Sequence, residues 1–147
     1  MLAEIGTYLQ TNLSTDLGAG AYPTTPIRTV QQGQGQPVEQ YPAIMLIPGP
    51  VRPRYMEIGA ADMDRTYEWR VYGTAPATSM SAAYTAAELY AKRLEAWIIT
   101  NNGLGGLTDG TESAYESTPG PWEVEIQGSG SQWIGYFMIP ILIQTTT

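Results

Sequence analysis

The segment from Trp133 to Ile143 constrains the fold more than any other part of the chain. A β-strand formed here has two apolar faces, because both sets of alternating side chains are apolar. The segment is too short to cross a bilayer as a helix, and it contains Pro140. No charged side chain follows Glu125. Such a strand lies in the centre of a sheet or is covered by another subunit.

The residues before this segment predict further strands. Trp122 to Ile126 alternates apolar and acidic side chains, and Gly128-Ser129-Gly130-Ser131 predicts the turn of a terminal hairpin. Residues 65–72 alternate in the same way, with Tyr67 and Trp69 on one face. Tight turns between such strands indicate a mainly antiparallel sheet.

Two further strands are predicted nearer the N-terminus. Ala43 to Ile47 is a continuous apolar run, typical of a strand covered on both faces, and Pro48-Gly49-Pro50 predicts a turn after it. Val51 to Ile58 alternates again, and Pro53 indicates an edge strand or a bulge. A second turn is expected at residues 59–62.

Two segments have the periodicity of helices. An apolar residue recurs every three or four positions over residues 2–13, which predicts a short helix. Residues 79–101 show a longer stripe, with Thr78 or Ser79 as the N-terminal cap and Asn101-Asn102-Gly103 as the stop. The apolar stripe of this second helix comprises Ala83, Ala87, Tyr90, Leu94, Trp97 and Ile98.

Two stretches lack this periodicity. Glycine and proline are frequent in residues 14–40, which predicts an extended arm or loop with at most one short strand near residues 27–30. Residues 102–121 are expected to form an acidic loop. The chain is therefore expected to be a single domain over residues 1–147, of the α+β class: a mainly antiparallel sheet with two helices packed on one face, and long irregular loops.

The composition excludes several classes of chemistry. The chain has 147 residues and contains neither histidine nor cysteine, which excludes disulfides, zinc sites, thiol nucleophiles and Ser-His-Asp triads. Its formal net charge of −7 repels the phosphate backbone of nucleic acids. No segment has the pattern of a targeting signal. We therefore expect no catalytic residue, no cofactor and no metal site, and predict that the chain is not an enzyme.

Acidic groups were the main candidates for chemistry. Glu123 and Glu125 lie two positions apart on a strand, so their carboxylates share a face, as the acid and base of a glycosidase could. Alternation along a strand explains the same placement without any reaction, and a solvated hairpin face is favoured. Asp62 to Asp64 and Asp109 to Glu112 could supply oxygen ligands to calcium or magnesium. Neither has the spacing of a calcium-binding loop, and turns favour Asp for local hydrogen bonding.

Four aromatic side chains admit two interpretations. They could form a stacking platform for sugars or single-stranded nucleic acid, or they could pack the sheet against its helices or a neighbouring subunit. Core packing is favoured, because Tyr67 and Trp69 alternate in step with Val71. The four residues are Tyr67, Trp69, Trp122 and Trp133.

The arginines between Arg52 and Arg70 are the main concentration of basic residues. With acidic residues beside them, they would give one face of the sheet charges of both signs, which could pair within one subunit or across two. A face of mixed sign suits contacts between identical subunits, because each sign meets its complement on the next copy. We therefore predict a subunit interface that contains Arg52, Arg54, Arg70, Glu123, Glu125, Tyr136 and Met138.

The order of these segments resembles that of the tail terminator (tail completion) proteins of long-tailed bacteriophages. The likeness is one of layout, and it rests on Leu2 to Leu13, Ala43 to Ile47, Tyr67 to Tyr72, Ala82 to Thr100 and Trp133 to Ile143. Related neck and head–tail connector proteins have a similar size and layout. Proteins of this family have no catalytic residues, so the resemblance implies none in this sequence.

The resemblance implies a structural virion protein. Copies of the chain would form a ring, a hexamer in this family, at the head-proximal end of the tail tube, where the ring ends tube growth and joins the tail to the head. The implied partners are the chain itself, the tail tube protein and the head–tail connector protein. DNA would pass through the lumen without specific binding, and no membrane is involved. Assembly would take place in the host cytoplasm, and the protein would reside in the tail or neck of the virion.

Two alternatives remain open. Within the same class, the chain could be a head–tail connector (neck) subunit or a tail tube subunit. In a different class, it could be a small carbohydrate-binding or glycosidase-like domain that uses the aromatic residues with Glu123 and Glu125.

Overall fold

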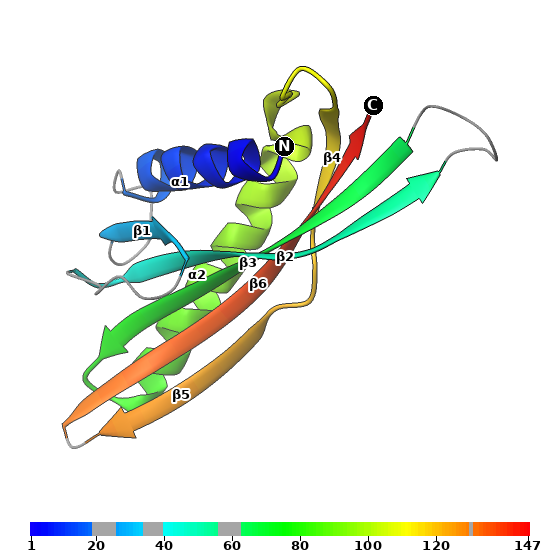
Figure 1. The fold of residues 1–147 in the computed structure, drawn as a ribbon. Coiled ribbons are helices and arrows are strands. Elements are labelled where there is room, and N and C mark those ends of the chain that lie inside the picture. The colour runs from blue at the N-terminus through cyan, green and yellow to red at the C-terminus, as the bar shows by residue number, and fades with distance from the viewer. Residues whose placement is uncertain (19–25, 34–39, 56–62, 130) are drawn as a thin grey trace.

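The computed structural model describes residues 1–18, 26–33, 40–55, 63–129 and 131–147. The elements in chain order are α1 (Leu2–Gly18), β1 (Thr29–Gln32), β2 (Ala43–Tyr55), β3 (Met63–Ala77), α2 (Met80–Thr100), the 3-10 helix η1 (Asn102–Gly105), β4 (Ser113–Pro119), β5 (Glu123–Ser129) and β6 (Gln132–Thr146). The strands form one sheet, which confirms the predicted α+β class (Figure 1). Among the described residues, neither α1 nor α2 has an apolar stretch long enough to span a bilayer.

Strand β6 lies inside the sheet, as its two apolar faces predict. The strand order is β1-β2-β3-β6-β4, and β5 also pairs with β6. Strand β3 follows one side of β6 along almost its whole length. The other side is shared, since β5 pairs with residues 132–138 and β4 with residues 141–146. Of the described strand pairs only β1 and β2 run parallel, so the sheet is mainly antiparallel.

Both helices cover the same face of this sheet. The odd-numbered residues of β3 from Tyr67 to Ala75, and of β6 from Gly135 to Thr145, are buried beneath them. Helix α1 lies against Trp69 on this face, and α2 lies against Gly135. The buried side chains of both helices and of the sheet belong to one hydrophobic cluster.

Helix α2 begins and ends close to the predicted positions. Ser79 caps it, because the Ser79 side chain accepts a hydrogen bond from the amide of Ala82 at 3.1 Å. All residues of its predicted apolar stripe are buried. Helix α1 runs past residue 13 to Gly18, where Leu17 continues its buried stripe. The indole N–H of Trp97 donates to Asp16 at 2.8 Å and so connects the two helices.

The predicted turn at residues 48–50 is wrong. Strand β2 continues through it and pairs with β3 on both sides, with a register shift between Pro48 and Val51. One extra residue is accommodated there as a β-bulge, so β2 stays paired with β3 where proline and glycine indicated a reversal of the chain. The prediction that the first part of β2 is covered on both faces is also wrong, since Met45 and Ile47 are only half-buried. The turn expected at residues 59–62 lies outside the described residues.

The predicted loop over residues 102–121 is also wrong in part, because it contains η1 and β4. The sequence of β4 does not show alternating polar and apolar residues, because a bulge between Ala114 and Glu116 breaks the two-residue period. In addition, one of the two buried residues of β4 is the polar Ser117. The Ser117 amide donates to the Asn102 side chain at 2.8 Å. In the predicted arm over residues 14–40, α1 ends at Gly18 and β1 pairs with β2, while residues 19–25 and 34–39 lie outside the described part.

Two glycines allow α2 to lie close to the strands. Phe137 places its ring over Gly73, its register partner on β3, and stacks on Tyr90 of α2 with ring centroids 5.8 Å apart. At Gly135, a side-chain carbon would lie 2.4 Å from the carbonyl oxygen of Ala83. The backbone of α2 therefore packs directly on the backbone of β6, and no residue larger than glycine fits at 135.

Replacing Gly135 by Ala is expected to lower the free energy of unfolding by about 1–3 kcal/mol, because the new methyl group would push α2 away from β6. Urea unfolding followed by circular dichroism measures this change. Gly18→Ala is the matched control, since its methyl group would meet the Ile27 carbonyl oxygen at an ordinary 3.5 Å. Equal stability of the wild type and Gly135→Ala would contradict the close packing described here.

Candidate functional site

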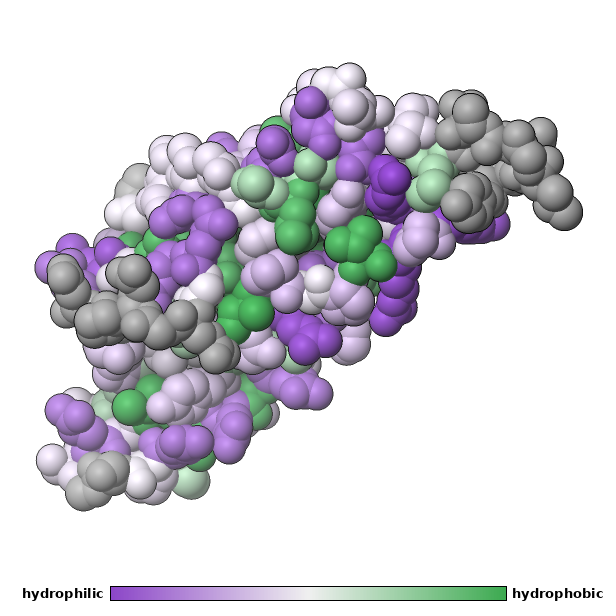
Figure 2. All heavy atoms as spheres, in the orientation of Figure 1, coloured by the Kyte–Doolittle hydropathy of each residue, from purple (hydrophilic) through white to green (hydrophobic). Residues whose placement is uncertain are grey.

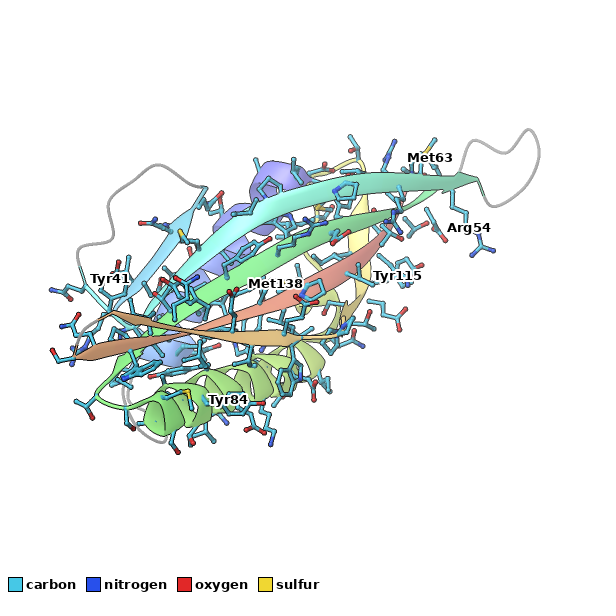
Figure 3. All side chains as sticks on the ribbon, turned by 90° about the horizontal axis from the view of Figure 1, so that it is seen from below. Tyr41, Arg54, Met63, Tyr84, Tyr115 and Met138 are labelled. Atoms are coloured by element: carbon cyan, nitrogen blue, oxygen red, sulfur yellow. The ribbon has the colours of Figure 1, made fainter. Side chains whose placement is uncertain are left out.

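The side of the sheet opposite the helices is uncovered among the described residues, and we call it the open face. Even-numbered residues of β3 and β6 lie on it, together with their register partners on β2, β4 and β5. Figure 3 looks onto the strands from the side opposite α1, with Met138 near the middle of the sheet. We call its apolar residues the apolar strip: Met45, Ile47, Tyr72, Ile134, Tyr136, Met138, Pro140 and Leu142.

Each residue of the apolar strip is half-buried, although no other element of the described chain lies over it. Neighbouring side chains on the open face shield one another at their sides, and the surfaces that point away from the sheet remain in water. A contiguous apolar surface of this kind on a soluble domain is typical of a binding surface. The open face is therefore the strongest candidate for a functional site.

A hollow of about 350 Å³ lies on the open face beside β5, and it extends from the middle of β6 into the first half of this strand. Tyr72 and Met138 are register partners at its centre, with Met45 beside Tyr72 and Glu123 beside Met138. Tyr136 and Glu125 form the next such pair. No basic residue is among the described residues that line the hollow. The hollow thus joins an apolar floor to an acidic rim on β5.

Six of the seven predicted interface residues fall into two separate groups on the open face, and Arg70 lies between the groups at the level of Pro140. Tyr136, Met138, Glu123 and Glu125 meet at the hollow. Arg52 and Arg54 lie at the opposite end of β2, at the levels of Gln144 and Thr146 on β6. Figure 3 shows Arg54 at this end, far from Met138. In Figure 2 strongly hydrophilic residues gather where β2 and β3 run toward the residues drawn in grey.

The separation excludes pairing of these charges within one copy. Arg54 and Glu123 lie at the levels of Thr146 and Met138 on β6, which the rise of a strand separates by roughly 26 Å. Arg70 is engaged elsewhere, since its Nε donates to Glu68 at 3.1 Å. Of the two pairings left open by the sequence, only the one across two subunits can join Arg52 and Arg54 to Glu123 and Glu125.

The four aromatic residues considered for a stacking platform do not form one on the open face. Tyr67 and Trp69 are buried beneath the helices, which confirms the core interpretation for these two. Trp122 donates its indole N–H to Glu95 of α2 at 3.0 Å. Trp133 packs against Gly128 across the β5–β6 hairpin. The aromatic residues that do line the hollow are Tyr72 and Tyr136 of the open face and the buried Phe137.

A second cluster, buried on the helix side, centres on Glu112. Its carboxylate accepts hydrogen bonds from Thr145 at 2.7 Å, from Arg65 at 3.1 Å and from the hydroxyl of Tyr67. Arg65 and Thr145 are register partners on β3 and β6, and both occupy positions whose phase faces the helices. Sequence analysis missed this cluster. The sequence feature that could have revealed the cluster is a pair of polar residues, Arg65 and Thr145. Both occupy odd positions of their strands, where the neighbouring odd positions carry apolar side chains.

Burial and hydrogen bonding shift the pKa values of Glu112 and Tyr67 in opposite directions. Burial opposes ionisation of Glu112, but the hydrogen bonds from Tyr67, Thr145 and Arg65 outweigh it and lower the pKa of Glu112 below its usual value. Burial, with the hydrogen bond to Glu112, raises the pKa of Tyr67 well above its usual range. Three donors provide hydrogen bonds to both oxygens of the Glu112 carboxylate, so we assign it a structural role that ties the loop before β4 to the sheet.

The acidic groups considered as metal ligands make other contacts. Asp109 accepts a hydrogen bond from the Met1 ammonium at 2.6 Å and from the amides of Thr111 and Glu112. The contact with the ammonium is the main reason that the pKa of Asp109 lies well below its usual range. Among the described residues no group of three or more acidic side chains converges on a common point. Asp62 lies outside the described residues, and Asp64 accepts from Tyr115.

The sequence matches no protein-family model, and a search of curated proteins returns no match. We therefore argue function from the residues of this chain.

Replacing Glu112 by Gln is expected to cost about 2–3 kcal/mol of unfolding free energy, because one amide oxygen cannot serve three donors and Arg65 loses its counter-charge. Thermal or urea unfolding at neutral pH measures the loss. Glu88→Gln is the matched control: it removes an exposed Glu88–Lys92 pair on α2, which is worth only about 0.3–0.5 kcal/mol.

The free energy of unfolding should also depend differently on pH in the wild type and in Glu112→Gln. Because folding lowers the pKa of Glu112 from 4.5, its contribution is present above that pH and is lost as the pH falls through the folded value. Wild-type stability should therefore decline more steeply than that of Glu112→Gln below about pH 4.5. Parallel pH profiles of the two proteins would contradict the role of Glu112 as a buried carboxylate.

Proposed function

We propose that the chain is a structural protein that assembles with copies of itself into a ring in a phage tail. In this proposal the ring sits at the head-proximal end of the tail tube, ends tube growth and joins the tail to the head connector. The apolar strip of the open face is the observation that carries the proposal. An apolar surface over a strand with no charge gains stability when another subunit covers it.

The distribution of charge supports the same proposal. Arg52 and Arg54 lie at one end of the open face, and the acidic rim of the hollow lies in the other half of this face. A surface with different signs at its two ends favours head-to-tail contacts between copies, and head-to-tail contacts close into rings when the rotation between copies permits. The net charge of −7 suits a lumen through which DNA passes without binding.

The remaining parts of the proposal rest on the resemblance of layout. These are the number of six copies, the tail tube protein and head connector as partners, assembly in the host cytoplasm, and residence in the tail or neck of the virion. A head–tail connector or a tail tube subunit would use the same surfaces. Imaging the position of the protein in a phage particle distinguishes these three structural roles.

Native mass spectrometry or analytical ultracentrifugation of the purified chain tests the proposal. The expected result is a discrete species of six times 16.0 kDa, alone or after addition of tail tube protein. Apolar contacts should keep part of this association at high salt, where charge pairs between exposed groups are screened. A strict monomer at high concentration, both alone and with tail tube protein, would refute the proposal.

The hollow favours one function of another class. Glu123 and Glu125 stand beside Tyr72 and Tyr136 there, so a small carbohydrate-binding or glycosidase-like site has a place in the fold. Both carboxylates are exposed, whereas the acid catalyst of a glycosidase usually lies in a pocket that shields it from water.

A glycan array and a panel of hydrolase substrates test this second candidate. Changing both Glu123 and Glu125 to Gln should abolish sugar binding or hydrolysis if the hollow is a sugar site. If assembly is the function, the same change alters oligomerisation and the wild type binds no sugar.

A further inference from the structure

The sheet ends in two edges that lack a neighbouring strand among the described residues. Strand β1 pairs with residues 43–46 of β2, so β2 from Ile47 to Tyr55 has no described strand on its outer side. At the opposite edge, β5 pairs with β6 alone. Figure 1 shows these two edges on opposite sides of the sheet. Unpaired edges expose backbone N–H and C=O groups that can hydrogen bond to a further strand.

The two edges carry opposite charges with the same spacing. Arg52 and Arg54 are two residues apart on β2, and Glu123 and Glu125 are two residues apart on β5. Register places both pairs on the open face, because their cross-strand partners Thr66, Asp64, Met138 and Tyr136 all belong to it. All four charged side chains are exposed, and none forms an ion pair among the described residues.

We infer that the β5 edge of one copy pairs with the β2 edge of the next, with Glu123 and Glu125 facing Arg52 and Arg54. This inference rests on the proposed self-assembly and names the residues that direct it. Opposite charges directly across two strands stabilise the pairing, and like charges oppose it. Because both pairs repeat every two residues on one face, two strands in register satisfy all four charges at once.

The inferred contact also extends the apolar strip. A strand added beside β5 brings the aliphatic stems of Arg52 and Arg54 to the acidic rim of the hollow, where Tyr136 and Met138 lie next to Glu125 and Glu123. Long arginine side chains commonly cover apolar surface while their charged ends meet carboxylates. The contact joins two different edges, so it is head-to-tail and leaves one free edge on each copy to continue the assembly.

Charges and proline on an edge can instead serve only to keep sheets apart. Either sign would do so on either edge. In this chain the exposed part of β2, residues 51–54, contains no acidic residue, and β5 contains no basic one. This division of sign between the two edges favours directed pairing over mutual exclusion.

Charge reversal tests the inference. One variant carries Arg52→Glu with Arg54→Glu, and the other carries Glu123→Arg with Glu125→Arg. Each variant alone has edges of one sign and should associate at least about tenfold more weakly than the wild type in sedimentation experiments. An equimolar mixture should regain the assembly, with the two variants alternating around an even-numbered ring. A chain with all four reversals should assemble alone.

Controls separate the two proposals. Circular dichroism should show that every variant is folded, since all four side chains are exposed. Exchange of Glu88 and Lys92 on α2, as Glu88→Lys with Lys92→Glu, leaves the net charge unchanged and should not affect association. If the wild type assembles and single-edge reversals assemble equally well, the inferred edge pairing is refuted and the proposed function stands. A wild type that stays monomeric with and without tail tube protein refutes both.

Discussion

The alternation of side chains along β6 is the constraint on which the rest of the structure depends. Its odd-numbered residues from Gly135 to Thr145 are buried under α1 and α2, and its even-numbered residues lie on the open face. Strand β3 pairs with β6 along almost its whole length and repeats the same division. One face of the sheet therefore holds the core of the domain. The other face carries the apolar strip, and no described element covers it. The same strand supplies both the stability of the single copy and the apolar surface for which we propose contact with another copy.

Strong periodicity made much of this fold predictable. The stripe of α2, the alternation of β3 and the terminal hairpin each appeared in the sequence, and each is found in the structure. Errors arose where a bulge interrupts the period. In β2 an extra residue follows Pro48, and in β4 the period shifts after Ala114, so both segments looked like turns or loops. Proline and glycine in the local sequence suggest a turn. They do not show whether pairing with a neighbouring strand keeps the segment in the sheet.

The candidate site was predictable in its residues but not in their arrangement. Alternation placed Glu123 and Glu125 on one face, but only the sheet order shows that Arg52 and Arg54 lie at the far end of that face. The Glu112 cluster depends on contacts between residues distant in sequence, such as Arg65 and Glu112. A polar residue in an apolar phase signals such a cluster, but its partner becomes known only with the tertiary structure.

The bulge between Pro48 and Val51 would affect the shape of the proposed assembly if copies pair through the β2 edge. A bulge bends its strand and increases the local twist. The half of β2 beside β1 and the half that carries Arg52 and Arg54 therefore point in different directions. In the proposed assembly, a copy docked on the second half would be inclined to the sheet of the first, and successive copies would trace an arc instead of a flat ribbon. The single inserted residue would then help to set the curvature of the ring, and with it the diameter of the opening at its centre.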